Sequence, residues 1–208
     1  ARAKGIKITC DRYPYTAAAT DLDIILPDWV YEGGNTEEKK RLGDPLCRER
    51  IIKEMKQEGL SQEFWGTIMI SSVFNKEKRG YEGKTVDQLS KMLKTPPLEF
   101  VLDLLYEEDC KVSVIFFNMS EENLARILKW DSVMVGSDSS LRSLKGVLNY
   151  GKPHPRGYGT FSRVIRKYVN ETSILSIEEA IYKMTGFPAQ TLGLKDRGIL
   201  KRSEERRV

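Results

Sequence analysis

Apolar residues recur along the chain with two spacings, and together they predict an alternation of strands and helices. Short runs of β-branched and apolar residues favour strands, whereas apolar residues three and four positions apart favour helices with one buried face. The predicted strands cover residues 6–10, 67–73, 112–117 and 133–135. The predicted helices cover residues 44–58, 86–93, 98–107, 121–128, 161–169, 177–184 and 188–192.

Polar residues at several predicted helix starts support these boundaries. Thr85 and Thr160 each precede an apolar run and are expected to act as N-caps. Ser176 and Glu179 have the spacing of a capping box, in which each side chain accepts a hydrogen bond from the other residue's backbone amide. The helices at about 35–60 are expected to form a peripheral insertion, because the buried strand patterns lie outside them.

The order strand, helix, strand between residues 111 and 135 predicts a βαβ unit. Two such strands are expected to be parallel and joined by a right-handed crossover. No repeat or linker divides the chain. We therefore expect an α/β fold with one main domain over residues 1–200 and a charged tail over 201–208.

Composition fits this class and argues against a membrane protein. The chain has 208 residues, of which 40% are hydrophobic and 31% charged, enough apolar side chains for a core. No apolar run reaches the roughly 18 residues that a transmembrane helix needs. The first residues lack a charged-then-apolar leader, which favours a cytoplasmic protein.

Cysteines and charge narrow the expected partners further. Cys10, Cys47 and Cys110 are far apart and odd in number, so neither a disulfide framework nor a paired-cysteine zinc motif is expected. The net charge is +4, but basic and acidic residues are interleaved except in the tail. Nucleic-acid binding requires a concentrated basic stripe, so we expect no nucleic-acid partner.

The first candidate for chemistry is Asp138, which follows the apolar strand over 133–135. In parallel α/β folds, residues at the carboxyl ends of strands form the active site. His154, the only histidine, and Arg156 lie in the following loop, so imidazole, guanidinium and carboxylate are expected to converge. The simpler interpretation is a strand-ending turn followed by an ordinary proline-containing loop.

Tyr13 and Tyr15 flank Pro14 directly after the first predicted strand. Proline lacks an amide hydrogen and pushes the preceding residue toward an extended conformation. Both rings therefore sit at a strand end, where aromatic packing is the simpler interpretation and substrate binding the alternative.

Short blocks of sequence follow one another along nearly the whole chain. They read Asp11-Arg12-Tyr13-Pro14-Tyr15-Thr16-Ala17, Leu26-Pro27-Asp28-Trp29, Glu32-Gly33-Gly34, Met134-Val135-Gly136-Ser137-Asp138, His154-Pro155-Arg156, Tyr158-Gly159-Thr160-Phe161, Leu175-Ser176-Ile177-Glu178-Glu179-Ala180, Lys183-Met184-Thr185 and Asp196-Arg197-Gly198. In this combination they resemble the C-terminal half of the N-acyl-D-amino-acid deacylases, the D-aminoacylase branch of the amidohydrolase superfamily.

The resemblance implies part of a (β/α)8 (TIM-type) barrel that hydrolyses a linear amide bond in an N-acyl amino acid with the help of zinc. On this basis Asp138 takes a proton from metal-bound water, passes it to the departing amine, and is a candidate metal ligand. The resemblance also assigns substrate contacts to Tyr13, His154 and Arg156.

The sequence departs from the family in three places. Its single histidine lies after Asp138, so the histidines expected of the family's metal site are missing. The segment 21–26 has no basic residue that could hold a substrate carboxylate, and the tail 201–208 is charged where the family continues into glycine-rich strands. A barrel lacking strands exposes a sheet edge, so self-association or association with an N-terminal half is expected.

Two other functions remain open from the sequence. The chain could be a non-catalytic α/β module for binding or assembly, which the single histidine favours. It could also bind anions through Arg156 and the amides before Thr160, since helix N-termini attract negative charge.

Overall fold

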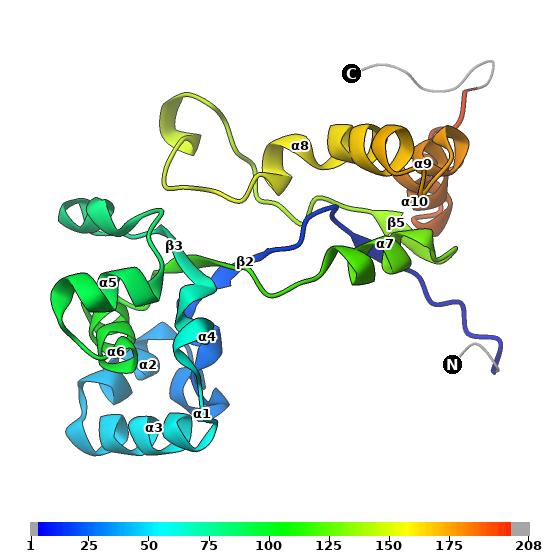
Figure 1. The fold of residues 1–208 in the computed structure, drawn as a ribbon. Coiled ribbons are helices and arrows are strands. Elements are labelled where there is room, and N and C mark those ends of the chain that lie inside the picture. The colour runs from blue at the N-terminus through cyan, green and yellow to red at the C-terminus, as the bar shows by residue number, and fades with distance from the viewer. Residues whose placement is uncertain (1–3, 201–208) are drawn as a thin grey trace. The chain divides into compact units, whose positions relative to one another are not determined.

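A computed structural model describes residues 4–200 of the chain, which form two compact units (Figure 1). Unit 1 consists of the described residues within 1–16, 119–142 and 155–208, and unit 2 consists of residues 17–118 and 143–154. Helices and strands are mixed along the chain, so it belongs to the α/β class that the sequence predicts.

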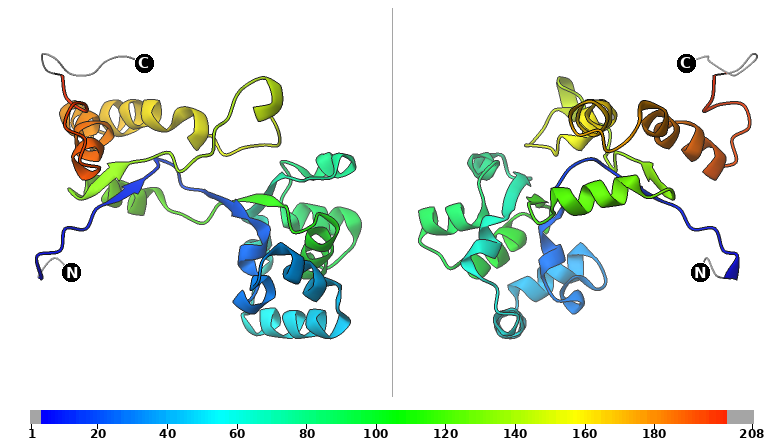
Figure 2. Two further views of the ribbon diagram at one scale, coloured as in Figure 1. Left: turned by 180° about the vertical axis from the view of Figure 1, so that it is seen from behind. Right: turned by 45° about the vertical axis from the view of Figure 1, so that its right-hand side comes forward.

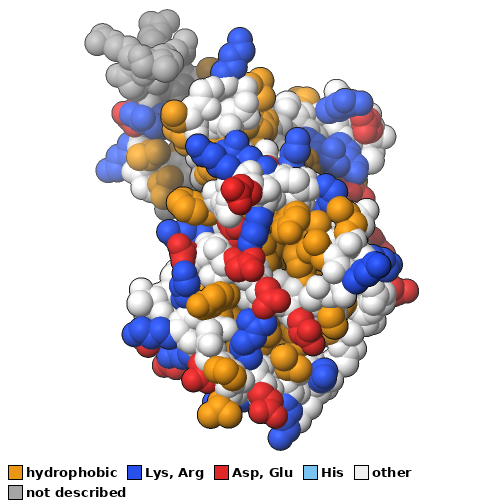
Figure 3. Space-filling view, turned by 90° about the vertical axis from the view of Figure 1, so that its left-hand side faces the viewer, with side chains coloured by type: hydrophobic (Ala, Val, Ile, Leu, Met, Phe, Trp, Pro, Cys, Tyr) orange, Lys and Arg blue, Asp and Glu red, His pale blue; other side chains and the backbone are white. Residues whose placement is uncertain are grey.

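The predictions about the tail, membrane spans and surface charge can be compared with the described residues. The predicted tail, 201–208, lies outside the described residues. In the part that the structure describes, no helix combines the length and the apolar character needed to cross a bilayer. Lys and Arg side chains alternate with Asp and Glu across the face drawn in Figure 3, as the interleaved sequence predicts.

Unit 1 is built on a parallel strand pair. Its elements are β1 (Cys10–Arg12), α7 (Glu121–Lys129), β5 (Val133–Val135), α8 (Arg156–Arg163), the π-helix η5 (Val164–Glu171), α9 (Ile177–Met184) and α10 (Gly186–Thr191). Strands β1 and β5 pair with Cys10 opposite Val133 and Arg12 opposite Val135. The unit's buried apolar core comprises Leu124, Leu128, Val135, Val164, Tyr168, Leu175 and Ala180.

Two predicted boundaries in unit 1 are wrong. The first strand is Cys10–Arg12 and not 6–10, because pairing with β5 begins where the Cys10 amide donates to the Ser132 carbonyl. Helix α8 begins at Arg156, so Thr160 is not an N-cap. Its hydroxyl instead donates to the Arg156 carbonyl inside the helix.

Unit 2 contains a three-stranded antiparallel sheet packed with helices (Figure 2). The strand order is β2 (Ala18–Asp21), β4 (Ser113–Phe116), β3 (Ile68–Ser72). Its helices are the 3-10 helix η2 (Leu22–Ile25), α1 (Asp28–Tyr31), α2 (Asn35–Gly43), α3 (Pro45–Gln57), α4 (Gln62–Gly66), the 3-10 helix η3 (Lys76–Tyr81), α5 (Val86–Leu93), α6 (Pro97–Glu107) and the 3-10 helix η4 (Gly146–Leu148). The capping predictions at Thr85 in this unit and at Ser176 in unit 1 are confirmed.

The predicted βαβ unit over residues 111–135 is wrong. Strand β4 lies between β2 and β3 and is antiparallel to both, whereas β5 pairs with β1. Order along the chain did not reveal the partners, because β2 reads Ala-Ala-Thr-Asp, a segment rich in residues that are depleted in strands.

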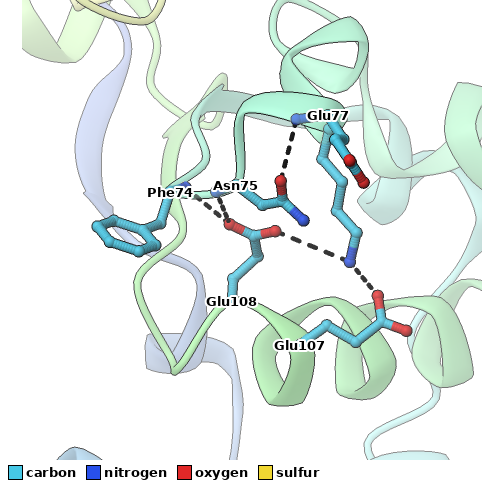
Figure 4. Close-up of polar contacts among 6 residues, drawn as sticks. Phe74, Asn75, Glu77, Glu107 and Glu108 are labelled. Carbon is cyan, nitrogen blue, oxygen red and sulfur yellow. Dashed lines mark hydrogen bonds and ion pairs between the residues drawn. The ribbon is translucent and has the colours of Figure 1, made fainter.

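A buried carboxylate joins α6 to the turn that follows β3 (Figure 4). Glu108, the C-cap of α6, is 1% exposed, and its Oε2 accepts hydrogen bonds from the amides of Phe74 and Asn75 at 2.7 and 2.8 Å. Lys78 approaches its other oxygen at 3.7 Å and also pairs with Glu107. The two amides and the ammonium group therefore offset the cost of burying this charge.

A second buried carboxylate, Glu38 of α2, has a different environment. It is 1% exposed, and burial together with the nearby Asp23 and Asp21 raises its pKa to about 7. The same surroundings raise the pKa of the Cys110 thiol to about 12, with burial first and Glu38 second among the causes. The acidic groups around Glu38 therefore favour its neutral form.

Replacing Glu38 by Gln is expected to remove a pH-dependent loss of stability. Because the folded-state pKa of about 7 lies above the ordinary 4.5, the folded chain holds this proton more tightly than the unfolded chain. The free energy of unfolding of the wild type should thus fall, by about 3 kcal/mol, as pH rises from below 4.5 to above 7. Urea unfolding followed by the fluorescence of buried Trp65 measures the slope.

Glu37→Gln is the matched control, because Glu37 is only half-buried in the same helical turn and its pKa is lowered by Lys40. Its loss should leave the fall with pH in place. Equal slopes for the wild type and Glu38→Gln would contradict the prediction.

Candidate functional site

The carboxyl ends of β1 and β5 meet at one edge of their sheet. Arg12 lies opposite Val135, and the Gly136 amide donates to the Arg12 carbonyl at 3.3 Å, so Tyr13 and Gly136 leave the sheet together. A Cβ atom at Gly136 would lie 2.9 Å from the Asp11 carboxyl carbon. A side chain at this position would therefore force the Asp11 carboxylate to move.

Asp138 stands beyond this edge in a left-handed backbone conformation, with φ of 48°. Aspartate tolerates this region better than most residues. Its side chain is 68% exposed, and its Oδ2 lies 3.0 Å from Nη1 of Arg156. The predicted carboxylate and guanidinium groups are thus brought together.

Arg156 is the buried member of the pair. It is the first residue of α8, its side chain is 10% exposed, and its guanidinium carbon lies 4.7 Å from the centroid of the Tyr13 ring. The guanidinium of Arg12 lies 4.1 Å from the same centroid. Two cations therefore contact one buried tyrosine, an arrangement that stabilises positive charge near the strand ends.

Further contacts fix the segment that carries Tyr13. Arg12 donates to the Tyr15 carbonyl at 3.1 Å, and Arg163 donates to the Pro14 carbonyl at 2.7 Å. Arg163 also lies 4.8 Å from the Tyr15 ring centroid, although burial is the larger influence on Tyr15 and raises its pKa. Tyr15 consequently supports the site as a packing residue.

His154 is placed in unit 2 and not among the residues of unit 1. It is 5% exposed, and its Nε2 lies 3.0 Å from the Ala17 carbonyl oxygen, next to the start of β2. This contact gives the imidazole a structural role in fixing the end of its loop. A substrate contact for His154 stays a prediction.

Sequence reasoning gave no role to several residues that shape the site. Arg12 and Asp11 stand in the same block as Tyr13 but were not singled out. Gly157 was also missed: a Cβ there would lie 2.6 Å from Ser139 Oγ, so the start of α8 packs tightly on the turn after Asp138. Side chains alternate between the two faces of a strand, and this alternation along β1 could have predicted on which face Asp11 lies.

The described residues do not fit a metal site. Within 4–200, no group of three or more histidine, cysteine, aspartate and glutamate side chains is placed to hold an ion. The raised pKa of Cys110 also disfavours the thiolate form that metal ligation requires. Asp138 is therefore a candidate metal ligand without companions in this part of the chain.

Comparison with known proteins connects this geometry to enzymes. No family model matches the chain. Over 91 residues it is 43% identical to an N-acyl-D-glutamate deacylase of Alcaligenes xylosoxydans xylosoxydans. The matched segment makes up 44% of this chain and 17% of that protein. Over 87 residues it is 39% identical to a D-aminoacylase of the same organism, a segment that makes up 42% of this chain and 16% of that protein. The matched segments, less than half of this chain, are thus similar to enzymes named as deacylases of N-acyl-D-amino acids.

The fold is also similar to that of a solved deacylase. A solved D-aminoacylase-family structure, the N-acyl-D-glutamate deacylase from Bordetella bronchiseptica complexed with zinc and a phosphonate inhibitor, matches with a TM-score of 0.67. The match has 24% sequence identity and covers 98% of this chain but 32% of that one. The chain thus spans a minor part of the length of the deacylases that it matches.

Gly136→Ala is expected to destabilise unit 1 by about 2 kcal/mol, because the added methyl group meets the Asp11 carboxylate. Asp11→Ala should offset much of this loss, so the two changes should be non-additive by about 1 kcal/mol in thermal or urea unfolding. Gly66→Ala is the control, since a Cβ there meets nothing within 4 Å. Additive effects of Gly136→Ala and Asp11→Ala would show that the close approach is unimportant.

Proposed function

We propose that this chain carries the catalytic-aspartate part of an amidohydrolase site that cleaves the linear amide bond of an N-acyl amino acid. The observation that supports this most is the pairing of exposed Asp138 with buried Arg156 over Tyr13, at the carboxyl edge of the parallel pair. The named activities of the sequence relatives point to the same substrate class.

The roles follow from the chemistry of each group. Asp138 acts as the general base that takes a proton from the attacking water, and afterwards as the general acid that protonates the leaving amine. Arg156 and Tyr13 contact the substrate, with the guanidinium of Arg156 suited to a carboxylate. His154 is kept as a substrate-binding candidate from the resemblance alone.

The proposed fold is part of a (β/α)8 barrel spanning residues 1–200, with 201–208 as a tail. Support comes from β1 and β5: a parallel pair requires a crossover connection, and α7 immediately precedes β5. The predicted helical insertion at about 35–60 corresponds to α2 and α3 in unit 2.

Zinc belongs to this proposal as the cofactor of the complete site. The relative from Bordetella bronchiseptica was solved with zinc, whereas the described residues here do not form a ligand set. The zinc would be held by groups outside residues 4–200 of this chain, and no step assigned to Asp138, Arg156 or Tyr13 depends on its geometry.

Association completes the proposal. The parallel sheet has two strands among the described residues, so β1 and β5 each retain an edge that can pair further. We therefore propose a homo-oligomer or a complex with an N-terminal half, in the cytoplasm, with a small-molecule substrate.

A non-catalytic binding or assembly module is the second candidate. The lack of a metal-ligand group within residues 4–200 favours it. Metal content and hydrolysis therefore separate the two functions.

The purified chain alone is expected to hold less than one zinc ion per molecule after incubation with zinc and gel filtration, because Asp138 lacks companion ligands. Elemental analysis normalised to protein measures this. A stoichiometric zinc content would mean that the chain supplies a complete ligand set.

In any assembly of the chain that hydrolyses N-acetyl-D-glutamate, Asp138→Asn is expected to lower kcat by at least about 100-fold, because the general base is lost. Circular dichroism should show an unchanged fold, since this side chain is exposed. Asp131→Asn, an exposed aspartate of the same unit, should retain activity. Unchanged turnover in Asp138→Asn would remove the catalytic assignment.

A further inference from the structure

We propose that Arg156 exchanges anions: its guanidinium holds Asp138 in the free protein and releases it when the carboxylate of an N-acyl amino acid binds. This inference rests on the proposed function for the identity of the ligand. It adds a positioning role for Arg156, which controls when the carboxylate of Asp138 becomes available.

The burial of the two partners identifies which one moves. The Arg156 side chain is 10% exposed, belongs to the first residue of α8, and lies over Tyr13. The Asp138 side chain is 68% exposed and follows a short strand. A buried guanidinium held by an aromatic ring and a helix keeps its place, so the exposed carboxylate is the partner that leaves.

The residues that follow Asp138 and Arg156 in sequence pack against each other. Gly157 packs against Ser139, with a Cβ at Gly157 only 2.6 Å from Ser139 Oγ. The residues that follow Asp138 and Arg156 in sequence are thus in close contact. Exchange therefore requires a rotation of the Asp138 side chain and no displacement of α8.

The local charge supports replacement of one anion by another. Around Tyr13, the cations Arg12 and Arg156 lie near the acidic groups Asp138 and Asp11, the latter beside Gly136. A second carboxylate bound to Arg156 would lie next to Asp138, and like charges at such a distance repel each other. Turning the exposed Asp138 side chain into solvent relieves this repulsion.

The exchange has a measurable consequence for affinity. An external carboxylate must compete with an internal one that is always nearby, so its apparent affinity is reduced by the fraction of Arg156 already occupied. Removing the charge of Asp138 should therefore tighten carboxylate binding. A residue that only performed acid-base chemistry would not have this effect.

The test is isothermal titration of the full chain with N-acetyl-D-glutamate, in a buffer containing a chelator so that metal ions do not compete for Asp138. Asp138→Asn is expected to bind about tenfold more tightly than the wild type, equivalent to about 1.4 kcal/mol. Arg156→Gln should lose binding, and Arg156→Lys should retain weakened binding with the same response to Asp138→Asn. The diamide of the ligand, which has no carboxylate, should bind all variants equally weakly.

Asp131→Asn is the matched control and should leave the affinity unchanged. Equal or weaker binding in Asp138→Asn, or no carboxylate binding by any folded variant, would overturn the exchange. Tighter binding in Asp138→Asn, combined with no hydrolysis by a zinc-containing assembly of the wild-type chain, would refute the proposed function but keep the exchange. Hydrolysis by the wild-type assembly, with equal affinities of the wild type and Asp138→Asn for the ligand, would keep the proposed function but refute the exchange.

Discussion

The pairing of two short parallel strands is the constraint on which unit 1 depends. Strands β1 and β5 have three residues each, yet their register places Tyr13, Gly136 and Asp138 at one edge. Few backbone hydrogen bonds hold so short a pair, so the side chains beyond it contribute to the register. Arg156 contributes most directly, because it contacts both Tyr13 and Asp138.

Three buried charged side chains are compensated in different ways. Glu108 is surrounded by donors, so its ionised form is compensated inside the protein. Glu38 faces other acidic groups, and its neutral form is favoured. The buried positive charge of Arg156 differs from both carboxylates, because the anion that compensates it, Asp138, is exposed at the surface. A buried charge with an accessible partner is suited to ligand exchange, whereas Glu108 has its partners built in.

Local sequence signals predicted the parts of the structure that local interactions determine. The capping residues Thr85 and Ser176 and the apolar strand before Asp138 were readable, because each acts within a few positions of itself. The strand pairing was not readable, since β2 lacks a strand-like pattern and β1 pairs with a segment distant in sequence. The approach of Arg156 to Asp138 was anticipated from their shared loop, but the place of His154 depended on a partner near β2.

The long excursion of the chain through residues 17–118 begins and ends at one point of unit 1, where the Met119 amide donates to the Thr16 carbonyl at 3.3 Å. Once unit 2 has folded, its ends need no longer search for each other as the ends of a flexible loop would. The conformational entropy lost when β1 finds β5 is then that of a short connection and not of a long one. Folding of unit 2 before the strands pair would therefore speed assembly of the site, because the folded segment would already bring residues 16 and 119 close together.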